Sequence, residues 1–181
     1  ANINLDDVEF KPGNSNIVYA IGKSFYRSID KGITWSNITS GLPVSGDISR
    51  SLIAVTPADQ EYVYAVFGNT SGGYLGTYRS TDSGVSFNWR STPASLSNNI
   101  LNCDTLTTTD AGQASHNLAI TVSPINAEIV TIGGCNVWQS IDGGETWKLR
   151  SYWLGYDANY PLDGEAYPDY VHADIQSLEY Q

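Results

Sequence analysis

The sequence contains little positive charge. It has 9 Lys and Arg residues against 19 Asp and Glu residues, which gives a formal net charge of −10. Nucleic-acid phosphates and anionic lipid surfaces are bound by clustered cations, so we expect neither as a partner. No run of about 18 apolar residues is present, so we expect no membrane insertion. The chain also lacks Met and begins with Ala1 without an apolar leader, so we expect any signal peptide to have been removed or to lie outside this chain.

Charged residues of both signs are scarce. They make up 15% of the chain, whereas about 25% is usual. Ser, Thr, Asn, Gly and Tyr take their place, which is typical of β-rich secreted proteins and predicts an extracellular or cell-surface location. Cysteine is limited to Cys103 and Cys135. In a secreted chain such a pair predicts a disulfide, and the alternative is two free, half-buried thiols.

Helical periodicity is almost absent, and the chain instead repeats itself. The stretch SIDKGITW recurs as STDSGVSF and again as SIDGGETW. Upstream of these lie VEFKPGNSNIVYAI, IAVTPADQEYVYAV and ITVSPINAEIVTIG, each predicting a strand, a tight turn and a second strand. The register agrees: 18 residues separate Pro12 from Asp30 and Pro124 from Asp142. The middle copy is longer because of a Gly-rich insertion around GNTSGGYL.

Each copy also predicts a third strand that ends at the eight-residue motif and a fourth that starts within it. Four short antiparallel strands repeated in tandem predict an all-β fold, a β-propeller of four-stranded antiparallel blades. Propellers close with about four to eight blades. We therefore expect a partial propeller whose ring is closed by remaining blades or by another chain. The expected bounds are about 1–46 for blade one, 47–113 for blade two, 114–170 for blade three, and 171–181 for the first strand of a fourth blade.

The three motifs resemble the Asp-box, or bacterial neuraminidase repeat, Ser-x-Asp-x-Gly-x-Thr-Trp. The second copy departs from it, with Ser86 and Phe87 at the last two positions. The resemblance implies a propeller like those of sialidases, xyloglucanase-type glycoside hydrolases and sortilin-type receptors. Together with the closing VHADIQSL, the boxes are also similar to surface proteins of Bacteroidetes exported by the type IX system. Those proteins often read His-Ala-Asp-x-His, and Gln176 stands here in place of the second His.

The box residues themselves are expected to be structural. A short Asp side chain can accept hydrogen bonds from N–H groups of its own turn, and Gly takes the positive φ that the turn needs. A residue that recurs in every blade is also a poor candidate for catalysis, because a reaction happens once per site. The residues expected in this role are Ser28, Asp30, Gly32, Trp35, Ser80, Asp82, Gly84, Phe87, Ser140, Asp142, Gly144 and Trp147.

The long loops are where we expect function, because loops beyond the usual length tend to carry it. The link that follows the third box combines aromatic rings with carboxylates, an arrangement typical of sugar binding. The ligand-binding candidates are Trp153, Tyr156, Asp157, Tyr160, Glu165 and Tyr167, together with His116. The same carboxylates could instead act as a glycosidase pair or bind Ca²⁺ weakly. The remaining alternative is a loop packed by its own tyrosines.

Asp174, His172 and Asp169 are weak candidates for catalysis. His172 with Asp174 could orient a water molecule or a substrate hydroxyl. Alternatively, both side chains bond the backbone of a neighbouring blade, because buried polar groups need partners. No motif predicts a dedicated metal site or another cofactor.

The hypothesis from the sequence is a secreted or cell-surface propeller that acts as a non-catalytic binding, adhesion or scaffold module. Its partner would be a glycan or a protein. Two alternatives stay open. One is a fragment of a glycoside hydrolase of the xyloglucanase or sialidase type, and the other is a sortilin-like receptor or a surface-assembly component.

Overall fold

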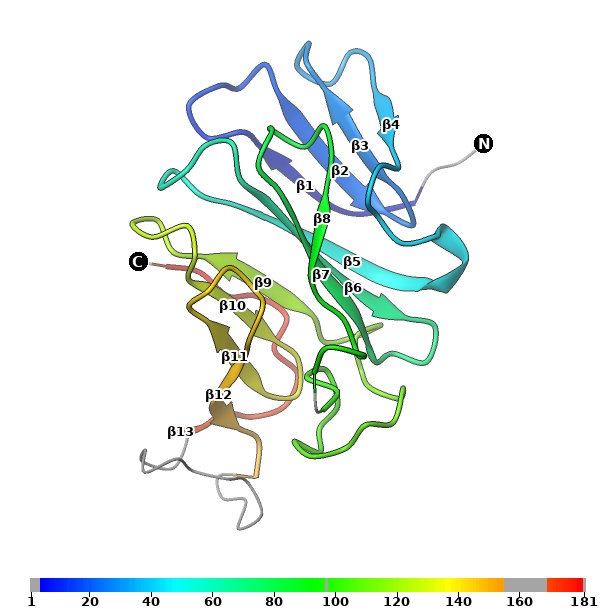
Figure 1. The fold of residues 1–181 in the computed structure, drawn as a ribbon, viewed down its shortest axis with the longest axis vertical. Coiled ribbons are helices and arrows are strands. Elements are labelled where there is room, and N and C mark those ends of the chain that lie inside the picture. The colour runs from blue at the N-terminus through cyan, green and yellow to red at the C-terminus, as the bar shows by residue number, and fades with distance from the viewer. Residues whose placement is uncertain (1–3, 97, 155–168, 181) are drawn as a thin grey trace.

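The computed structural model describes residues 4–96, 98–154 and 169–180. These residues form three sheets, each built on four antiparallel strands, which follow one another through the molecule (Figure 1). The fold is therefore all-β, as predicted, and has the form of a partial propeller. Apart from a three-residue 3-10 turn, η1 (Ser45–Asp47), the described residues contain no helix. None of them forms a helix long and apolar enough to cross a membrane.

The strands occur in chain order within each sheet, and each sheet has its first strand at one edge. Sheet 1 contains β1 (Leu5–Phe10), β2 (Val18–Gly22), β3 (Phe25–Ser28) and β4 (Ser36–Ile38). Sheet 2 contains β5 (Ile48–Val55), β6 (Val63–Asn69), β7 (Tyr74–Ser80) and β8 (Asn88–Ser91). Sheet 3 contains β9 (Ala119–Val122), β10 (Val130–Gly133), β11 (Val137–Ser140) and β12 (Lys148–Tyr152), and a short fifth strand, β13 (Asp169–Tyr170), adds to β12 at its edge.

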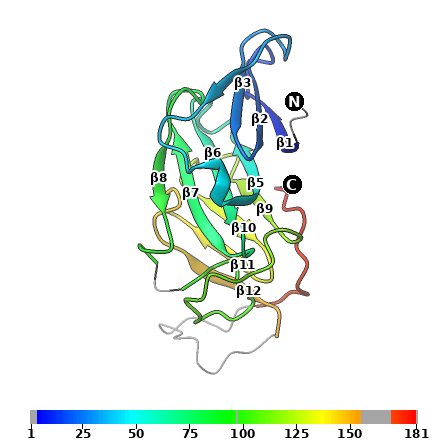
Figure 2. The ribbon, with the colours of Figure 1, turned by 90° about the vertical axis from the view of Figure 1, so that its right-hand side faces the viewer.

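The second strands are buried on both faces, because the sheets stack on one another (Figure 2). Between sheets 1 and 2, Phe25 meets Phe87 edge to face, with ring centroids 4.8 Å apart. Between sheets 2 and 3, a separate cluster contains Val66, Tyr74 and Trp138. This is why the second strands read as continuous β-branched and aromatic runs rather than as an alternating pattern.

The link between sheets 2 and 3 (residues 92–118) is part of the core. Ile100 and Leu101 are completely buried in the cluster between these sheets. Asn99 accepts a hydrogen bond from the N–H of Tyr74 (2.9 Å) and donates one to the carbonyl of Thr109 (2.7 Å). The unusual length of this link therefore has a packing reason, apart from any ligand that it could bind.

A disulfide joins this link to sheet 3. It connects Cys103 with Cys135, whose Cα atoms are 5.0 Å apart. Trp153 donates from Nε1 to the carbonyl of Cys103 (3.0 Å), and its own N–H donates to Asn136 (3.1 Å). The disulfide and these hydrogen bonds hold the link against the end of β12.

For the C-terminal segment the repeat predicts the first strand of a fourth blade, which stays a prediction. Residues 171–180 form no strand, because a strand is defined by a hydrogen-bonded partner and no described residue provides a ladder beside them. The segment instead runs beside β9 and β10: Ile175 donates its N–H to Gly134 (3.1 Å) and packs its side chain on Gly133. An unexpected short strand, β13 (Asp169–Tyr170), pairs in parallel with β12.

Candidate functional site

The three motif turns, residues 28–35, 80–87 and 140–147, are here called the Asp turns. Each Ser hydroxyl donates to the Asp carboxylate and accepts from the N–H of the Gly two residues after that Asp. In the first turn these distances are both 2.8 Å, and Thr34 adds two further bonds to Asp30 (2.8 and 2.6 Å). The equivalent bonds recur around Asp82 and Asp142. The carboxylate therefore holds the turn together.

These bonds stabilise the charged form of the carboxylates. The hydroxyl and N–H of Thr34 and the hydroxyl of Ser28 lower the pKa of Asp30 to about 2. At Asp82 and Asp142, partial burial alone would raise the pKa. The hydrogen bonds from neighbouring hydroxyls and N–H groups outweigh it, and both pKa values lie below the usual range. A carboxylate with a lowered pKa, whose oxygens already accept hydrogen bonds, is poorly suited to proton transfer near neutral pH.

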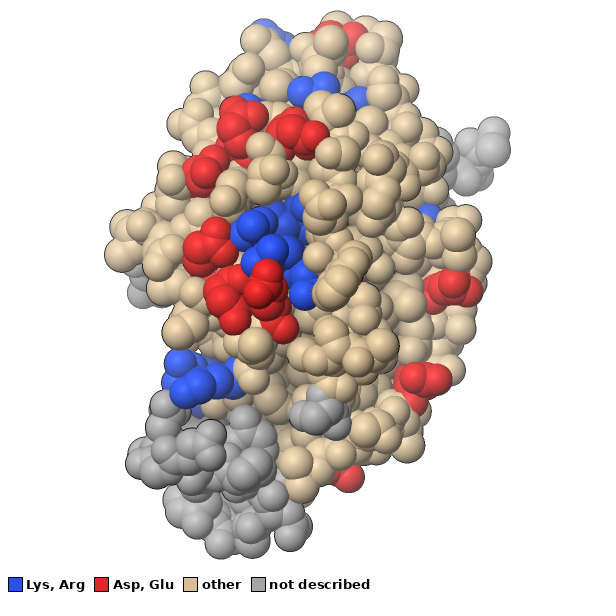
Figure 3. Space-filling view, viewed as in Figure 1, with Lys and Arg blue, Asp and Glu red and all other residues tan. Residues whose placement is uncertain are grey.

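The Arg residues beside the Asp turns join one sheet to the next. Arg27 donates from Nε to the carbonyl of Ser83 (2.7 Å), and Arg79 forms an ion pair with Glu128 (2.8 Å). Arg90 donates to the carbonyl of Gly143 (2.9 Å). Figure 3 shows Lys and Arg gathered in the middle of one face with Asp and Glu beside them. We attribute the arrangement to contacts between sheets, because each of these bonds crosses from one sheet to its neighbour.

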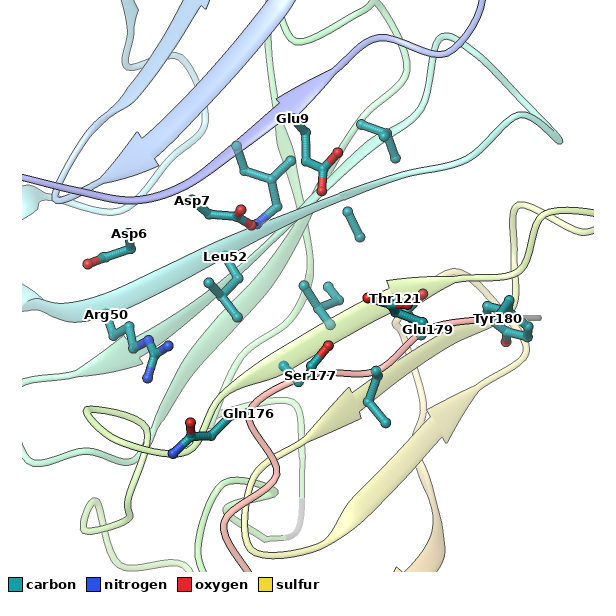
Figure 4. A pocket seen from close by; sticks show the side chains of 16 residues that line it. Asp6, Asp7, Glu9, Arg50, Leu52, Thr121, Gln176, Ser177, Glu179 and Tyr180 are labelled. Atoms are coloured by element: carbon teal, nitrogen blue, oxygen red, sulfur yellow. The ribbon is translucent and has the colours of Figure 1, made fainter.

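A groove of about 540 Å³ lies where the first strands of the three sheets approach one another and the C-terminal segment (Figure 4). We call it the inner groove. Its walls are β1, β5, β9 and residues 176–180. Asp6, Asp7 and Glu9 come from β1 and Glu179 from the C-terminal segment, while Arg50 of β5 is its one Lys or Arg residue. The inner groove is therefore open, polar and mainly acidic.

Two of these carboxylates have backbone partners. Asp6 accepts from the N–H of Ser51 (3.1 Å) and Asp7 from the N–H of Ile53 (2.9 Å), both on the free edge of β5. Glu9 differs from them: burial and then the charge of Asp7 raise its pKa to about 7. Glu9 is therefore partly protonated near neutral pH. Asp6 and Asp7 tie sheet 1 to sheet 2, while Glu9 is half-buried at the wall of the inner groove.

The residues predicted from the sequence are not brought together at this groove. His172 is exposed, with Nδ1 3.9 Å from Asp174 Oδ2, and Asp174 accepts a hydrogen bond from Asn117 (2.7 Å). The backbone carbonyl of His116 accepts a bond from Arg50 (2.8 Å). The side chains of His116, His172 and Asp174 do not line the inner groove. Asp174 thus bonds the side chain of Asn117 in the link before β9, whereas the alternative predicted bonds from both side chains to the backbone of a neighbouring blade, and it stays a prediction.

The tyrosine-rich link is only partly covered by the structure. Tyr156, Asp157, Tyr160, Glu165 and Tyr167 lie outside the described residues, and so does the side chain of Asp169. The expectations of sugar or weak Ca²⁺ binding rested on this stretch and remain predictions. Within the described part of the chain, no group of three or more His, Cys, Asp or Glu side chains could hold a metal ion.

Sequence reasoning missed the inner groove, although the repeat contained a signal for it. Glu9 lies three residues before Pro12, at the position that Glu179 takes when the C-terminal segment is aligned with the other first strands. Two acidic residues at one repeat position, on strands expected nearest the axis, indicate a shared acidic surface.

Comparison with known proteins shows the fold. No protein-family model and no curated protein match the sequence. Among solved structures, an ancestral GH74 enzyme superposes with a TM-score of 0.56 at 20% identity, over 81% of this chain and 19% of that one. The GH74 xyloglucanase from Xanthomonas campestris superposes with a TM-score of 0.54 at 19% identity, over 84% of this chain and 21% of that one. YCF48 from Cyanidioschyzon merolae superposes with a TM-score of 0.52 at 16% identity, over 81% of this chain and 37% of that one.

These similar structures are β-propellers, and identities below 25% support the fold alone. The chain spans about a fifth of the length of the two GH74 structures and less than two fifths of YCF48. It therefore corresponds to a segment of a propeller in each of them.

Proposed function

We propose that this chain is part of a secreted or cell-surface β-propeller that works as a non-catalytic binding module for a protein partner. The observation that carries the proposal is the inner groove, an open acidic surface bounded by the edge strands β1, β5 and β9. Edge strands present backbone groups that can pair with an added peptide, although on β5 the N–H groups of Ser51 and Ile53 are already bonded by Asp6 and Asp7. A basic segment of a partner protein would find complementary charge on Glu9 and Glu179.

A protein fits the described part of this groove better than a glycan does. Sugars are held by aromatic rings, and the only aromatic side chain among the residues that line the groove is Tyr180, which is 43% exposed. YCF48, one of the similar propellers, has been solved bound to D1 peptide. That precedent supports a peptide ligand for the fold, and the acidic lining supports a basic one here.

The proposal includes further blades. Equivalent repeat positions have very different exposure in sheets 1 and 2: Val8 is 49% exposed and Ile53 2%, both four residues before the turn Pro. Likewise Trp35 is 41% exposed and Phe87 3%, both five residues after the box Asp. Sheet 1 covers these positions of sheet 2. We infer that another blade, from the same protein or from another chain, covers them in sheet 1.

The secreted or surface location has independent support. Disulfides persist in oxidising compartments, and Cys103–Cys135 is bonded. The resemblance of the Asp turns and of VHADIQSL to exported surface proteins, including those of the type IX system, points in the same direction. A redox-sensitive fusion that reports the compartment of the expressed protein would test this part of the proposal.

The binding test uses charge reversal. An array of basic peptides is screened with the 181-residue chain, and the strongest peptide is titrated against Glu179→Lys and against Asp47→Lys, an exposed acidic position outside the groove. We expect the groove variant to weaken binding about tenfold or more, the usual consequence of losing a charged contact, while the control leaves it unchanged. Equal binding by both variants would refute the assignment of the groove.

Glycoside hydrolysis is the second candidate, because the pKa of Glu9 near 7 is what a general acid requires. Such an enzyme needs a second carboxylate across the substrate, and Glu179 is the other unassigned acid of the groove. Incubation with xyloglucan and with sialyl-lactose, followed by measurement of released reducing sugar or sialic acid, tests it. Release by the natural chain that disappears in Glu9→Gln would favour the enzyme.

A further inference from the structure

The first strands of the three sheets each have one free edge at the inner groove. Within the described part of the chain, β1, β5 and β9 each pair only with the second strand of their own sheet. Val8, Ile53 and Ile120 lie at the same place on these strands, four residues before the turn Pro, and each pairs with the residue eight places after it. The backbone N–H groups of these three residues can therefore be compared directly.

Two of these three N–H groups are bonded by the same carboxylate. Asp7 accepts from the N–H of Val8 through Oδ1 (2.8 Å) and from the N–H of Ile53 through Oδ2 (2.9 Å). Asp6 accepts in the same way from the N–H of Ser51, two residues earlier on β5 (3.1 Å). Side chains of β1 thus cover N–H groups at the free edge of β5, and covering an edge keeps it from pairing with another strand.

The edge of β9 has no such cover. In β5 the residues at the repeat positions of Asp6 and Asp7 are Ser51 and Leu52. Ser51 donates its hydroxyl to the carbonyl of Gly22 (2.7 Å), and the apolar side chain of Leu52 packs against the cluster between sheets 2 and 3. The cover of β5 comes from the sheet that precedes it, and the sheet that precedes β9 is present here without a carboxylate at either position. Further blades are therefore not expected to supply the cover.

The N–H of Ile120 points to this free edge. Ser123, three residues further along, donates its N–H to the carbonyl of Ile129 on the side of β10 (2.9 Å), and N–H directions alternate along a strand. The described residues include no acceptor for the N–H of Ile120. Ala119, Ile120 and Thr121 line the inner groove (Figure 4). A backbone donor at an open groove is available to an added chain.

We propose that the basic segment of the partner binds as an extended strand along the free edge of β9 and accepts a hydrogen bond from the N–H of Ile120; this inference rests on the proposed function of the inner groove. A backbone carbonyl suits this donor, because the carboxylates of Asp6, Asp7, Glu9 and Glu179 would repel an acidic acceptor. Alternate side chains of a strand point to the same face. A segment with Lys or Arg at every second position would therefore present its charges together.

The first test transplants the cover of β5 onto β9. The probe is a fluorescent nine-residue peptide, Thr-Lys-Val-Lys-Val-Lys-Val-Lys-Thr, titrated with the full 181-residue chain and with Leu52→Asp. Val85→Asp, which adds the same charge at an exposed position outside the groove, is the control.

Strand pairing and attraction by charge alone predict opposite results for this variant. Leu52→Asp places a carboxylate at the repeat position of Asp7, where it would occupy the N–H of Ile120. Pairing therefore predicts binding weakened by several-fold to about tenfold, the value of one hydrogen bond, although the variant makes the groove more acidic. A peptide held by charge alone would bind Leu52→Asp as tightly as the natural chain or more tightly, and this result would overturn the inference.

Amide hydrogen exchange in the natural chain gives a second readout that needs no substitution. At a peptide concentration of about one hundred times Kd, the N–H of Ile120 should exchange roughly 100-fold more slowly, because exchange then proceeds from the free chain. The N–H of Ile53 already has a carboxylate partner and is the matched control, which should keep its rate. No slowing at Ile120, or equal slowing at both positions, would overturn the strand pairing.

The strand pairing and the groove assignment fail in different ways. If the probe does not bind, or if Glu179→Lys leaves its binding unchanged, the assignment of the inner groove is refuted and the pairing with it. Saturable binding that Glu179→Lys weakens, without slower exchange at Ile120, would retain the groove and refute only the pairing with β9.

Discussion

The packing of the sheets predicts that truncating the aromatic side chain at two equivalent repeat positions lowers the free energy of unfolding by different amounts. Phe87→Ala and Trp35→Ala both remove the aromatic ring that ends an Asp turn. Phe87 is 3% exposed and packs against Phe25 of the preceding sheet, with ring centroids 4.8 Å apart. Trp35 is 41% exposed and donates from Nε1 only to Gly32 of its own turn. Among the residues that the structure describes, the same repeat position therefore has a neighbouring sheet at Phe87 and none at Trp35.

The expected magnitudes differ accordingly. Removing a buried Phe leaves a cavity and usually lowers the free energy of unfolding by about 3–5 kcal/mol. Truncating an exposed aromatic ring lowers it by about 1 kcal/mol or less. For a chain of this size about 1 kcal/mol corresponds to roughly 2–4 °C in Tm. Phe87→Ala should therefore lower Tm by about 10 °C, and Trp35→Ala by a few degrees at most.

Thermal unfolding followed by near-UV circular dichroism measures both changes under identical conditions. Similar decreases in Tm at the two positions would refute the reasoning, because they would mean that the aromatic ring stabilises the turn itself and not the contact between sheets. The same pair then tests ring closure. In a protein that contains the blade preceding sheet 1, the loss for Trp35→Ala should rise toward that for Phe87→Ala.

Three further predictions concern the disulfide and two kinds of carboxylate. Cys135→Ser should lower the free energy of unfolding by about 3 kcal/mol in the loop-entropy picture, seen as an earlier midpoint in urea; an unchanged midpoint would contradict a stabilising role. The folded-state pKa of Asp30 is about 2, below the unfolded value of about 3.9, so its contribution to the free energy of unfolding is present above pH 4 and is lost as pH falls toward 2. The pKa of Asp82 is also lowered and acts in the same direction. Asp82→Asn should therefore flatten the acid limb of a stability–pH curve. The pKa of Glu9 is raised to about 7, above the unfolded value of about 4.3. The stability that Glu9 contributes is therefore fully present below about pH 4.3 and is lost as pH rises through 7. Glu9→Gln should stabilise the chain at pH 8 more than at pH 5, and a pH-independent effect would argue against the raised pKa.

The fold followed from the sequence because repetition removes most of its ambiguity. A single SIDKGITW is a short pattern, but three copies at a constant distance from a turn Pro indicate the same four strands each time. The apolar runs VYAI, VYAV and IVTI became second strands buried on both faces. The Asp turns depend on contacts within a few residues, such as those between Asp30 and Thr34. Local contacts of this kind can be inferred from sequence spacing.

The candidate sites could not be inferred in the same way. The inner groove joins Glu9 to Glu179 across almost the whole length of the chain, and a smaller cavity between sheets 1 and 2 joins the turn at Lys23 to Phe67. Both depend on how sheets are placed side by side. The link between sheets 2 and 3, residues 92–118, contributes to the core because apolar side chains such as Leu101 pack between the two sheets, and the sequence alone does not show this contact.

By itself the sequence determined the strand order, the turns and the repeated interfaces, since these arise from alternation, turn chemistry and spacing along the chain. The tertiary structure alone decided which carboxylates bond the neighbouring strand, as Asp6 and Asp7 do, and which stand at an open groove, as Glu9 does. It also decided which repeat positions are covered and which are not. The physical reason is that burial and the pKa of a side chain depend on atoms brought close by folding, and these come from distant parts of the chain.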